Sequence, residues 1–122
     1  MGATIPFKLI TPSKVVFEGD AELVIATTTE GEEGILANHA PFLTALKPGV
    51  LRANIVDGGG SRRIELATGE GFMQALPDRV TVLVDRAVAF DEVDIAQARA
   101  EVDHADPVVV EFAQAKLRLT GH

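Results

Sequence analysis

The first two-thirds of the chain is a succession of short apolar segments separated by turn residues, and this succession restricts the fold more than any other feature. Segment Val80–Val84 shows the alternation of branched apolar side chains that is typical of a strand. The predicted strands are Phe7–Ile10, Val15–Phe17, Glu22–Thr27, Phe42–Leu46, Val50–Val56, Arg63–Ala67, Gly71–Ala75 and Val80–Val84. Many short strands with frequent turns indicate a β-sandwich or a barrel.

Three turns are predicted between these strands. Lys47–Gly49 suits a type II turn, in which Pro48 presets φ and Gly49 adopts a positive φ. Asp57–Ser61 contains three consecutive glycines and predicts the tip of a hairpin, and Leu76–Arg79 predicts another turn.

The pattern changes to helical spacing after about residue 90. Asp91 is expected to cap a helix that extends to about His104. Asp106 followed by Pro107 predicts a second helix start, and Gly121 is placed to end that helix after about residue 119. Because the connection is short, we expect an antiparallel helical hairpin. The chain is therefore expected to have two parts, a β-domain over residues 1–88 and a helical hairpin over residues 89–122.

Composition excludes several function classes. The net charge is −7 and there is no Trp or Tyr, so neither phosphate contacts nor base stacking is favoured and no nucleic-acid partner is expected. The chain has no cysteine, which excludes disulfides and thiolate metal sites. The first ten residues lack the pattern of a signal peptide, and no apolar stretch approaches the roughly 20 residues of a membrane helix. We therefore expect any membrane association to be indirect.

Catalytic and metal-binding patterns are not found in the sequence. His39, His104 and His122 do not occur at a metal-ligand spacing, and His39 is more typical of a hydrogen-bonded turn residue. Ser13 and Ser61 are not placed in a nucleophile elbow. No catalytic residue and no metal site is therefore predicted.

Three glutamates gather at one point of the chain, at Glu30, Glu32 and Glu33. Paired carboxylates can perform acid–base chemistry, but only in a pocket that shifts their pKa. The cluster is also compatible with a solvated loop or with a charged loop that contacts a partner.

The same glutamates open a longer motif. Residues 30–51 read Glu-Gly-Glu-Glu-Gly-Ile-Leu-Ala-Asn-His-Ala-Pro-Phe-Leu-Thr-Ala-Leu-Lys-Pro-Gly-Val-Leu, which closely resembles a segment of the epsilon subunit family of F-type ATP synthases. Segments Leu9–Pro12, Ala67–Phe72 and Ala113–Leu119 resemble the family in the same order. The resemblance implies a flattened β-sandwich of about ten strands followed by a C-terminal antiparallel two-helix hairpin.

The resemblance also implies a function. It implies a non-catalytic rotor subunit of the central stalk that couples the gamma subunit to the c-ring of a proton- or sodium-driven enzyme. Glu30, Glu32 and Glu33 would then contact the c-ring, and Thr11 and His39 would contact gamma. The implied location is peripheral, on the cytoplasmic face of the bacterial inner membrane.

The hairpin is the regulatory part of many family members. It would restrain ATP hydrolysis through contacts with the alpha and beta subunits. Some relatives bind ATP there through a motif that aligns with residues 93–98, but Gln97 stands where that motif has Arg. No cofactor is therefore expected, and Asp94 and Arg99 are the candidates for a weak ATP site. An independent small β-sandwich enzyme or ligand-binding module is the alternative interpretation.

Overall fold

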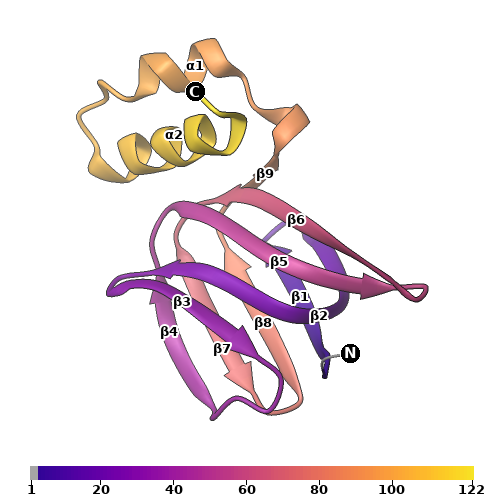
Figure 1. The fold of residues 1–122 in the computed structure, drawn as a ribbon. Helices are drawn as coiled ribbons and strands as arrows, with labels where there is room; N and C mark the ends of the chain where they lie inside the picture. The colour runs from indigo at the N-terminus through magenta and orange to yellow at the C-terminus, as the bar shows by residue number, and fades with distance from the viewer. Residues whose placement is uncertain (1–2) are drawn as a thin grey trace.

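A computed structural model of the chain describes residues 3–122. In this range the chain forms nine strands followed by a short 3-10 helix and two α-helices (Figure 1). The strands are β1 (Ile5–Thr11), β2 (Lys14–Thr28), β3 (Gly31–Leu36), β4 (Phe42–Leu46), β5 (Gly49–Asp57), β6 (Gly60–Thr68), β7 (Gly71–Leu76), β8 (Arg79–Val84) and β9 (Ala87–Ala89). The helices are η1 (Phe90–Glu92), α1 (Ile95–Glu101) and α2 (Pro107–Thr120).

The strands build a flattened sandwich in two layers. They follow the order β1-β8-β7-β4-β2-β5-β6-β9, with β3 paired to β2. Strand β1 also pairs with β2, so one layer contains β1, β8, β7 and β4, and the other contains β3, β2, β5 and β6. The long strand β2 belongs to both layers, because its first half pairs with β1 and its second half with β3 and β5.

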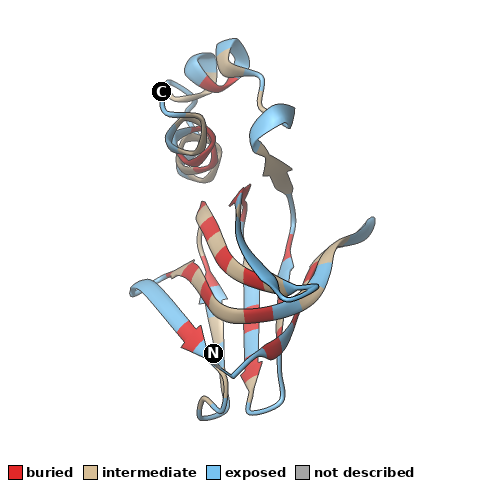
Figure 2. Ribbon diagram, turned by 45° about the vertical axis from the view of Figure 1, so that its right-hand side comes forward, coloured by how far each residue is buried: buried red, intermediate tan, exposed pale blue. Residues whose placement is uncertain are grey.

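The core lies between the two layers. Buried and more exposed residues alternate along the strands, as Figure 2 shows, because successive side chains of a strand point to opposite faces. The largest side chains that are fully buried come from both layers: Ile5, Phe7, Leu9, Val24, Ile35, Leu51, Ile55, Met73, Val80, Val82 and Val84. The β-sandwich predicted from the sequence is therefore confirmed.

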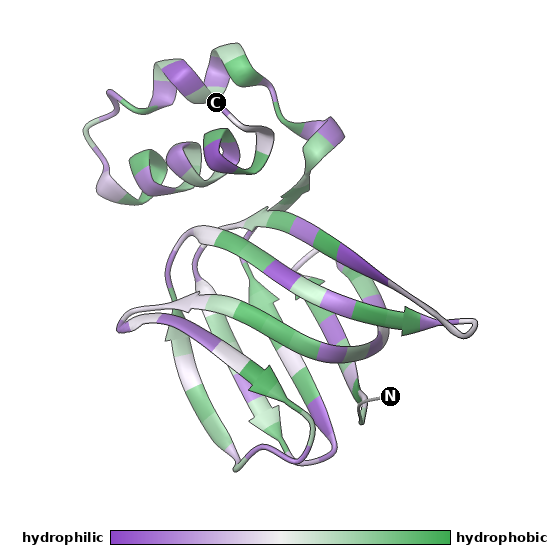
Figure 3. Ribbon diagram, viewed as in Figure 1, coloured by the Kyte–Doolittle hydropathy of each residue, from purple (hydrophilic) through white to green (hydrophobic). Residues whose placement is uncertain are grey.

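The strand boundaries differ from the sequence expectation in three places. Val15–Phe17 and Glu22–Thr27 belong to one long strand, whose pairing with β5 shifts register between Ala21 and Leu23. Strand β3 was not expected, because four of its six residues are Gly or Glu and only Ile35 is buried. Figure 3 shows β3 changing from hydrophilic at its start to hydrophobic at its end. Strand β9 has only three residues and was also not predicted.

Two of the three predicted turns are confirmed. Gly58 and Gly59 have φ of 57° and 84° at the tip of the β5–β6 hairpin, and β7 and β8 are joined at residues 77–78. The prediction for Gly49 is wrong, since this residue begins β5 and does not have a positive φ. Glycine is required there for lack of space: a Cβ atom on Gly49 would lie 2.6 Å from the Cβ of Thr27.

The first helix begins later than predicted. Asp94, and not Asp91, caps α1, because its Oδ1 accepts a hydrogen bond of 3.0 Å from the backbone N–H of Gln97. The helix ends at Glu101. The signals for α2 are confirmed: Asp106 is the N-cap, and Gly121 ends the helix with φ of 80°.

The two α-helices form a hairpin that packs on one end of the sandwich, beside β5, β6 and β9 (Figure 1). Phe112 and Ala115 of α2 are buried against Ala67 of β6. The guanidinium of Arg86 lies 4.6 Å from the centre of the Phe112 ring. Helix α1 packs on α2, where the Nζ of Lys116 donates to Glu101 Oε1 at 3.0 Å. The hairpin is therefore attached to the sandwich mainly through α2.

Candidate interaction surfaces

The acidic cluster lies at a tight turn between β2 and β3. Thr28 stabilises this turn, because its Oγ1 donates to the carbonyl of Gly31 at 2.7 Å and accepts from the N–H of Glu30 at 3.1 Å. Gly31 adopts φ of 119°, a conformation that side chains other than glycine resist. The turn presents Glu30, Glu32 and Glu33 on the surface, and all three are exposed.

The three carboxylates have different surroundings. Glu30 and Glu33 line a hollow of about 320 Å³, together with Phe42, Leu43 and Thr44 of β4. The carboxylate of Glu32 instead accepts a hydrogen bond of 2.7 Å from Arg52 Nη2 on β5. The structure therefore brings the three residues to one turn but directs them to two sides of it.

An apolar row crosses the outer face of the other layer. Ile10, Leu83, Phe72 and Ala45 are direct neighbours on β1, β8, β7 and β4, because the strand registers pair each with the next. Leu43 precedes Ala45 by two residues on β4 and therefore lies on the same face of the sheet. The exposed fractions of Leu43, Phe72 and Leu83 are 68%, 57% and 47%. Contiguous apolar surface of this kind is typical of a contact with another molecule.

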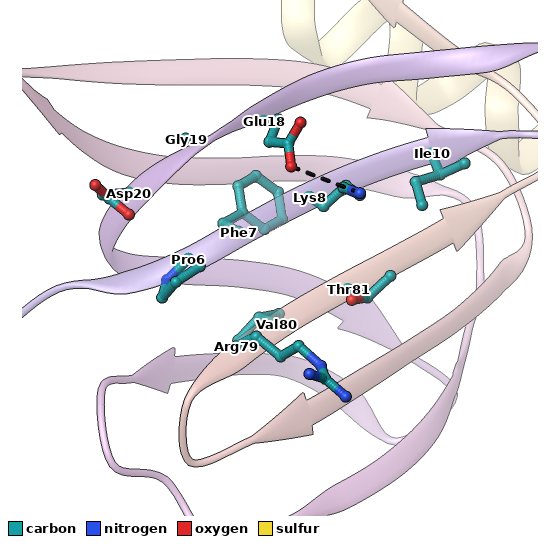
Figure 4. Close-up of a pocket in the computed structure, with 10 residues that line it drawn as sticks. All are labelled: Pro6, Phe7, Lys8, Ile10, Glu18, Gly19, Asp20, Arg79, Val80 and Thr81. Carbon is teal, nitrogen blue, oxygen red and sulfur yellow. Dashed lines mark ion pairs between the residues drawn. The ribbon is translucent and has the colours of Figure 1, made fainter.

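A shallow groove of about 500 Å³ continues from this row along β1 (Figure 4). Its floor includes Pro6 and Ile10 of β1 and Thr81 of β8. Lys8 crosses the groove toward Glu18 of β2, with 3.5 Å between Nζ and Oε2. The mixed charges and open shape suit a protein contact better than an enclosed ligand site.

The two residues expected on the gamma side have different environments. Thr11 belongs to the buried phase of β1 and is only 8% exposed, and its Oγ1 lies 3.4 Å from the carbonyl of Lys14. His39 is half-buried, with its ring against Phe42 at 5.0 Å and its Nδ1 2.7 Å from the carbonyl of Ala40. Thr11 thus follows Ile10 of the apolar row directly, and His39 packs on the residue before Leu43.

The residues suggested for a weak ATP site are not brought together. Asp94 uses its carboxylate to cap α1. The Nη2 of Arg99 lies 3.2 Å from Nδ1 of His122. Within residues 3–122, no hydrogen bond or ion pair joins Asp94 to Arg99.

In the described residues, no group of three or more His, Cys, Asp or Glu side chains is arranged to hold a metal ion. Across residues 3–122, every helix is too short or too polar to cross a membrane.

Sequence reasoning missed the apolar row. The available signal was the presence of apolar residues in both phases of one strand, as in β8, where Leu83 stands between the buried Val82 and Val84. Such a strand is apolar on the core face and on the outer face, and the outer residues then need a separate explanation.

Comparisons with known proteins agree with one another and span most of the chain. Residues 4–90 match the family described as "ATP synthase, Delta/Epsilon chain, beta-sandwich domain". The ATP synthase epsilon chain of Desulfosudis oleivorans is 38% identical over 106 residues, which cover 87% of this chain and 77% of the relative. The ATP synthase epsilon chain of an Exiguobacterium species is 39% identical over 123 residues, which cover 95% of this chain and 88% of the relative.

Solved structures with a similar fold come from two mitochondrial enzymes. One is a chain of the Euglena gracilis mitochondrial ATP synthase, from a structure of OSCP, F1 and the c-ring, with a TM-score of 0.67, 23% identity and coverage of 99% of this chain and 79% of that one. The other belongs to the central stalk and c-ring of the Tetrahymena thermophila enzyme, with a TM-score of 0.60, 18% identity and coverage of 98% and 96%. These likenesses concern the fold, whereas the sequence matches span most of the chain. The chain therefore belongs to the family of ATP synthase delta/epsilon chains.

Proposed function

We propose that this chain is a rotor subunit of the central stalk, which joins the gamma subunit to the c-ring of an ATP synthase. Its family membership makes it a non-catalytic, peripheral subunit of that enzyme. The proposed location is the cytoplasmic face of a bacterial inner membrane, since the relatives described above by sequence are bacterial. The proposed coupling ion is a proton or sodium.

The apolar row is the observation that carries the gamma contact. Leu43, Phe72 and Leu83 expose large apolar side chains on adjacent strands, and covering them with a partner removes apolar area from water. Thr11 directly follows Ile10 of this row in the chain, and His39 packs on Phe42, the residue before Leu43. We assign them to the margin of the gamma interface, where their main role is to hold the local backbone.

The acidic turn is the proposed contact with the c-ring. Glu30, Glu32 and Glu33 give this turn a strong negative charge, which would be complementary to basic and amide groups on the polar loops of the ring. Complementary charge contributes more to registration and to the rate of association than to affinity. A turn fixed by Thr28 and Gly31 can transmit force better than a mobile loop, because its backbone donors and acceptors are already paired.

The hairpin is the proposed contact with the alpha and beta subunits. Residues 91–122 contain three basic and seven acidic residues, so this segment has a net charge of −4. Such a charge opposes ATP binding and also opposes contact with an acidic surface of a partner. We therefore expect the hairpin to inhibit ATP hydrolysis only weakly and to hold no cofactor. Asp94 and Arg99 would provide at most a weak ATP site.

A double variant of the apolar row tests the gamma contact. Phe72→Ser and Leu83→Ser together should weaken binding of the chain to purified gamma by about 100-fold, since each half-exposed side chain contributes about 1–2 kcal/mol when it becomes fully buried. Calorimetric titration provides the measurement. The matched control is Leu36→Ser with Phe90→Ser, which removes apolar side chains of similar exposure, 58% and 63%, from outside the row. Equal losses in the two variants, or no loss in the first, would refute the assignment.

A further inference from the structure

Strand β3 carries the acidic turn but is weakly held by the rest of the fold. It lies off the main path of the sheet, and within residues 3–122 it pairs with β2 alone. Five of its six residues are exposed, and Ile35 is its one buried side chain. One edge of backbone hydrogen bonds and one apolar anchor therefore hold the strand, and its first half has hydrogen bonds within the turn but no apolar anchor on the sheet.

Arg52 supplies a constraint at that position. It lies on β5, which is separated from β3 by β2, and its Nη2 lies 2.7 Å from Oε2 of Glu32. Its side chain is 25% exposed, and its Nε is buried without a hydrogen-bond partner within residues 3–122. Glu65, its cross-strand neighbour on β6, is paired with Arg63 at 3.5 Å. The guanidinium of Arg52 is thus directed across β2 toward β3.

The alternation of side chains along β3 separates the glutamates into two groups. Glu32 lies in the phase of Gly34 and faces Arg52, and it lines a cavity with Thr27, Arg52 and Glu65. Glu33 lies in the phase of the buried Ile35 and faces the hollow beside β4. Among the described residues, neither Glu30 nor Glu33 forms an ion pair.

We infer that Arg52 is a positioning residue and that its pair with Glu32 is a strut, which fixes the β2–β3 turn so that Glu30 and Glu33 face the ring. This inference rests on the proposed function, because it assigns different roles to the residues of the proposed ring contact. Glu32 then acts within the chain through Arg52, while Glu30 and Glu33 meet the basic groups of the partner.

The exposure of the pair makes this inference testable without unfolding the protein. The side chain of Glu32 is 53% exposed, and an ion pair at such a position contributes little to the stability of the fold. Loss of the strut should therefore change the orientation of the turn and leave the core intact. The melting temperature of each variant checks that it remains folded.

Charge exchange provides the test. The full chain is bound together with gamma to membranes that contain the ring, and retention is measured at increasing ionic strength. Arg52→Met and Glu32→Arg should each weaken retention by about threefold or more. A change of about threefold is the smallest that clearly exceeds the usual deviation from additivity in a double-mutant cycle. The exchange of both residues, Arg52→Glu with Glu32→Arg, keeps the net charge and rebuilds the strut, so it should restore retention to within about threefold of the unmodified chain.

Each result has one interpretation. If the exchange variant binds as weakly as Glu32→Arg alone, Glu32 touches the ring directly and the strut is refuted. Unaltered retention of the single variants refutes it as well. The proposed function is tested separately by Glu30→Gln with Glu33→Gln: full retention of this variant shows that the turn does not face the ring. The matched control exchanges the exposed pair Asp57 and Arg62 at the β5–β6 hairpin, which should leave retention unchanged.

Discussion

Phe112 is the residue on which attachment of the helical hairpin most depends. Its side chain is 4% exposed and packs with Ala115 against the sandwich at Ala67. Arg86 of the sandwich and Lys116 of α2 lie at 4.6 and 4.9 Å from the centre of its ring. We therefore expect Phe112→Ala to detach the hairpin while the sandwich stays folded.

The magnitude follows from the burial of this side chain. Truncation of a buried Phe to Ala costs about 3–5 kcal/mol, and each cation–π contact contributes about 0.5–1 kcal/mol to that value. The other polar link, Lys47 to Glu111 at 3.1 Å, joins side chains that are 44% and 36% exposed, so it contributes less than about 1 kcal/mol. Docking of the hairpin should therefore weaken by about 3 kcal/mol, with Ala115 and Leu119 left as apolar contacts of α2 on the sandwich.

Hydrogen exchange of the backbone amides measures this effect. Protection in α1 and α2 should fall by about 100-fold, while protection in β5 and β8 should change little. Phe90→Ala is the matched control, because this Phe is 63% exposed and its removal should leave protection unchanged. An equal loss of protection in the helices and in the core strands would refute the reasoning, since the hairpin and the sandwich would then unfold as one unit.

Three further predictions concern the sandwich, the acidic turn and the nucleotide. Gly49→Val should lower the free energy of unfolding by about 1–3 kcal/mol, since its side chain would collide with Thr27; an unchanged melting temperature would show that Thr27 can move aside. Replacing Glu30, Glu32 and Glu33 together with Gln should weaken attachment to the membrane sector most at low salt, and retention that does not depend on ionic strength would argue against this contact. Titration calorimetry should show that the isolated chain binds ATP with a Kd above about 1 mM, a binding free energy weaker than about −4 kcal/mol, and micromolar affinity would overturn the charge argument.

The architecture could be predicted because local signals agreed with one another. Strand β4 has the predicted boundaries, Phe42–Leu46, since a proline precedes it and Pro48 follows it closely. The Asp106–Pro107 start and the Gly121 end of α2 depend on backbone geometry that few other residues provide. Such positions are determined within a few residues, and the sequence alone is sufficient for them.

Features that depend on distant residues could not be predicted in the same way. Strand β3 is stabilised by pairing with β2 and by Arg52, and its own Gly and Glu residues disfavour a strand. Asp91 was predicted to cap the first helix, but residues 90–92 form η1 after β9, and α1 begins only after its N-cap Asp94. The apolar row is formed by registers among four strands, which no segment of the sequence specifies by itself.

Purification of the tagged chain from membranes of its source organism tests the central claim most directly. The chain is tagged at its N-terminus and solubilised with mild detergent, and the bound subunits are quantified by mass spectrometry. Gamma and the c-ring subunit should be recovered with it, and Phe72→Ser with Leu83→Ser should remove gamma. Recovery of the unmodified chain without gamma or the ring would contradict its assignment as the subunit that joins them.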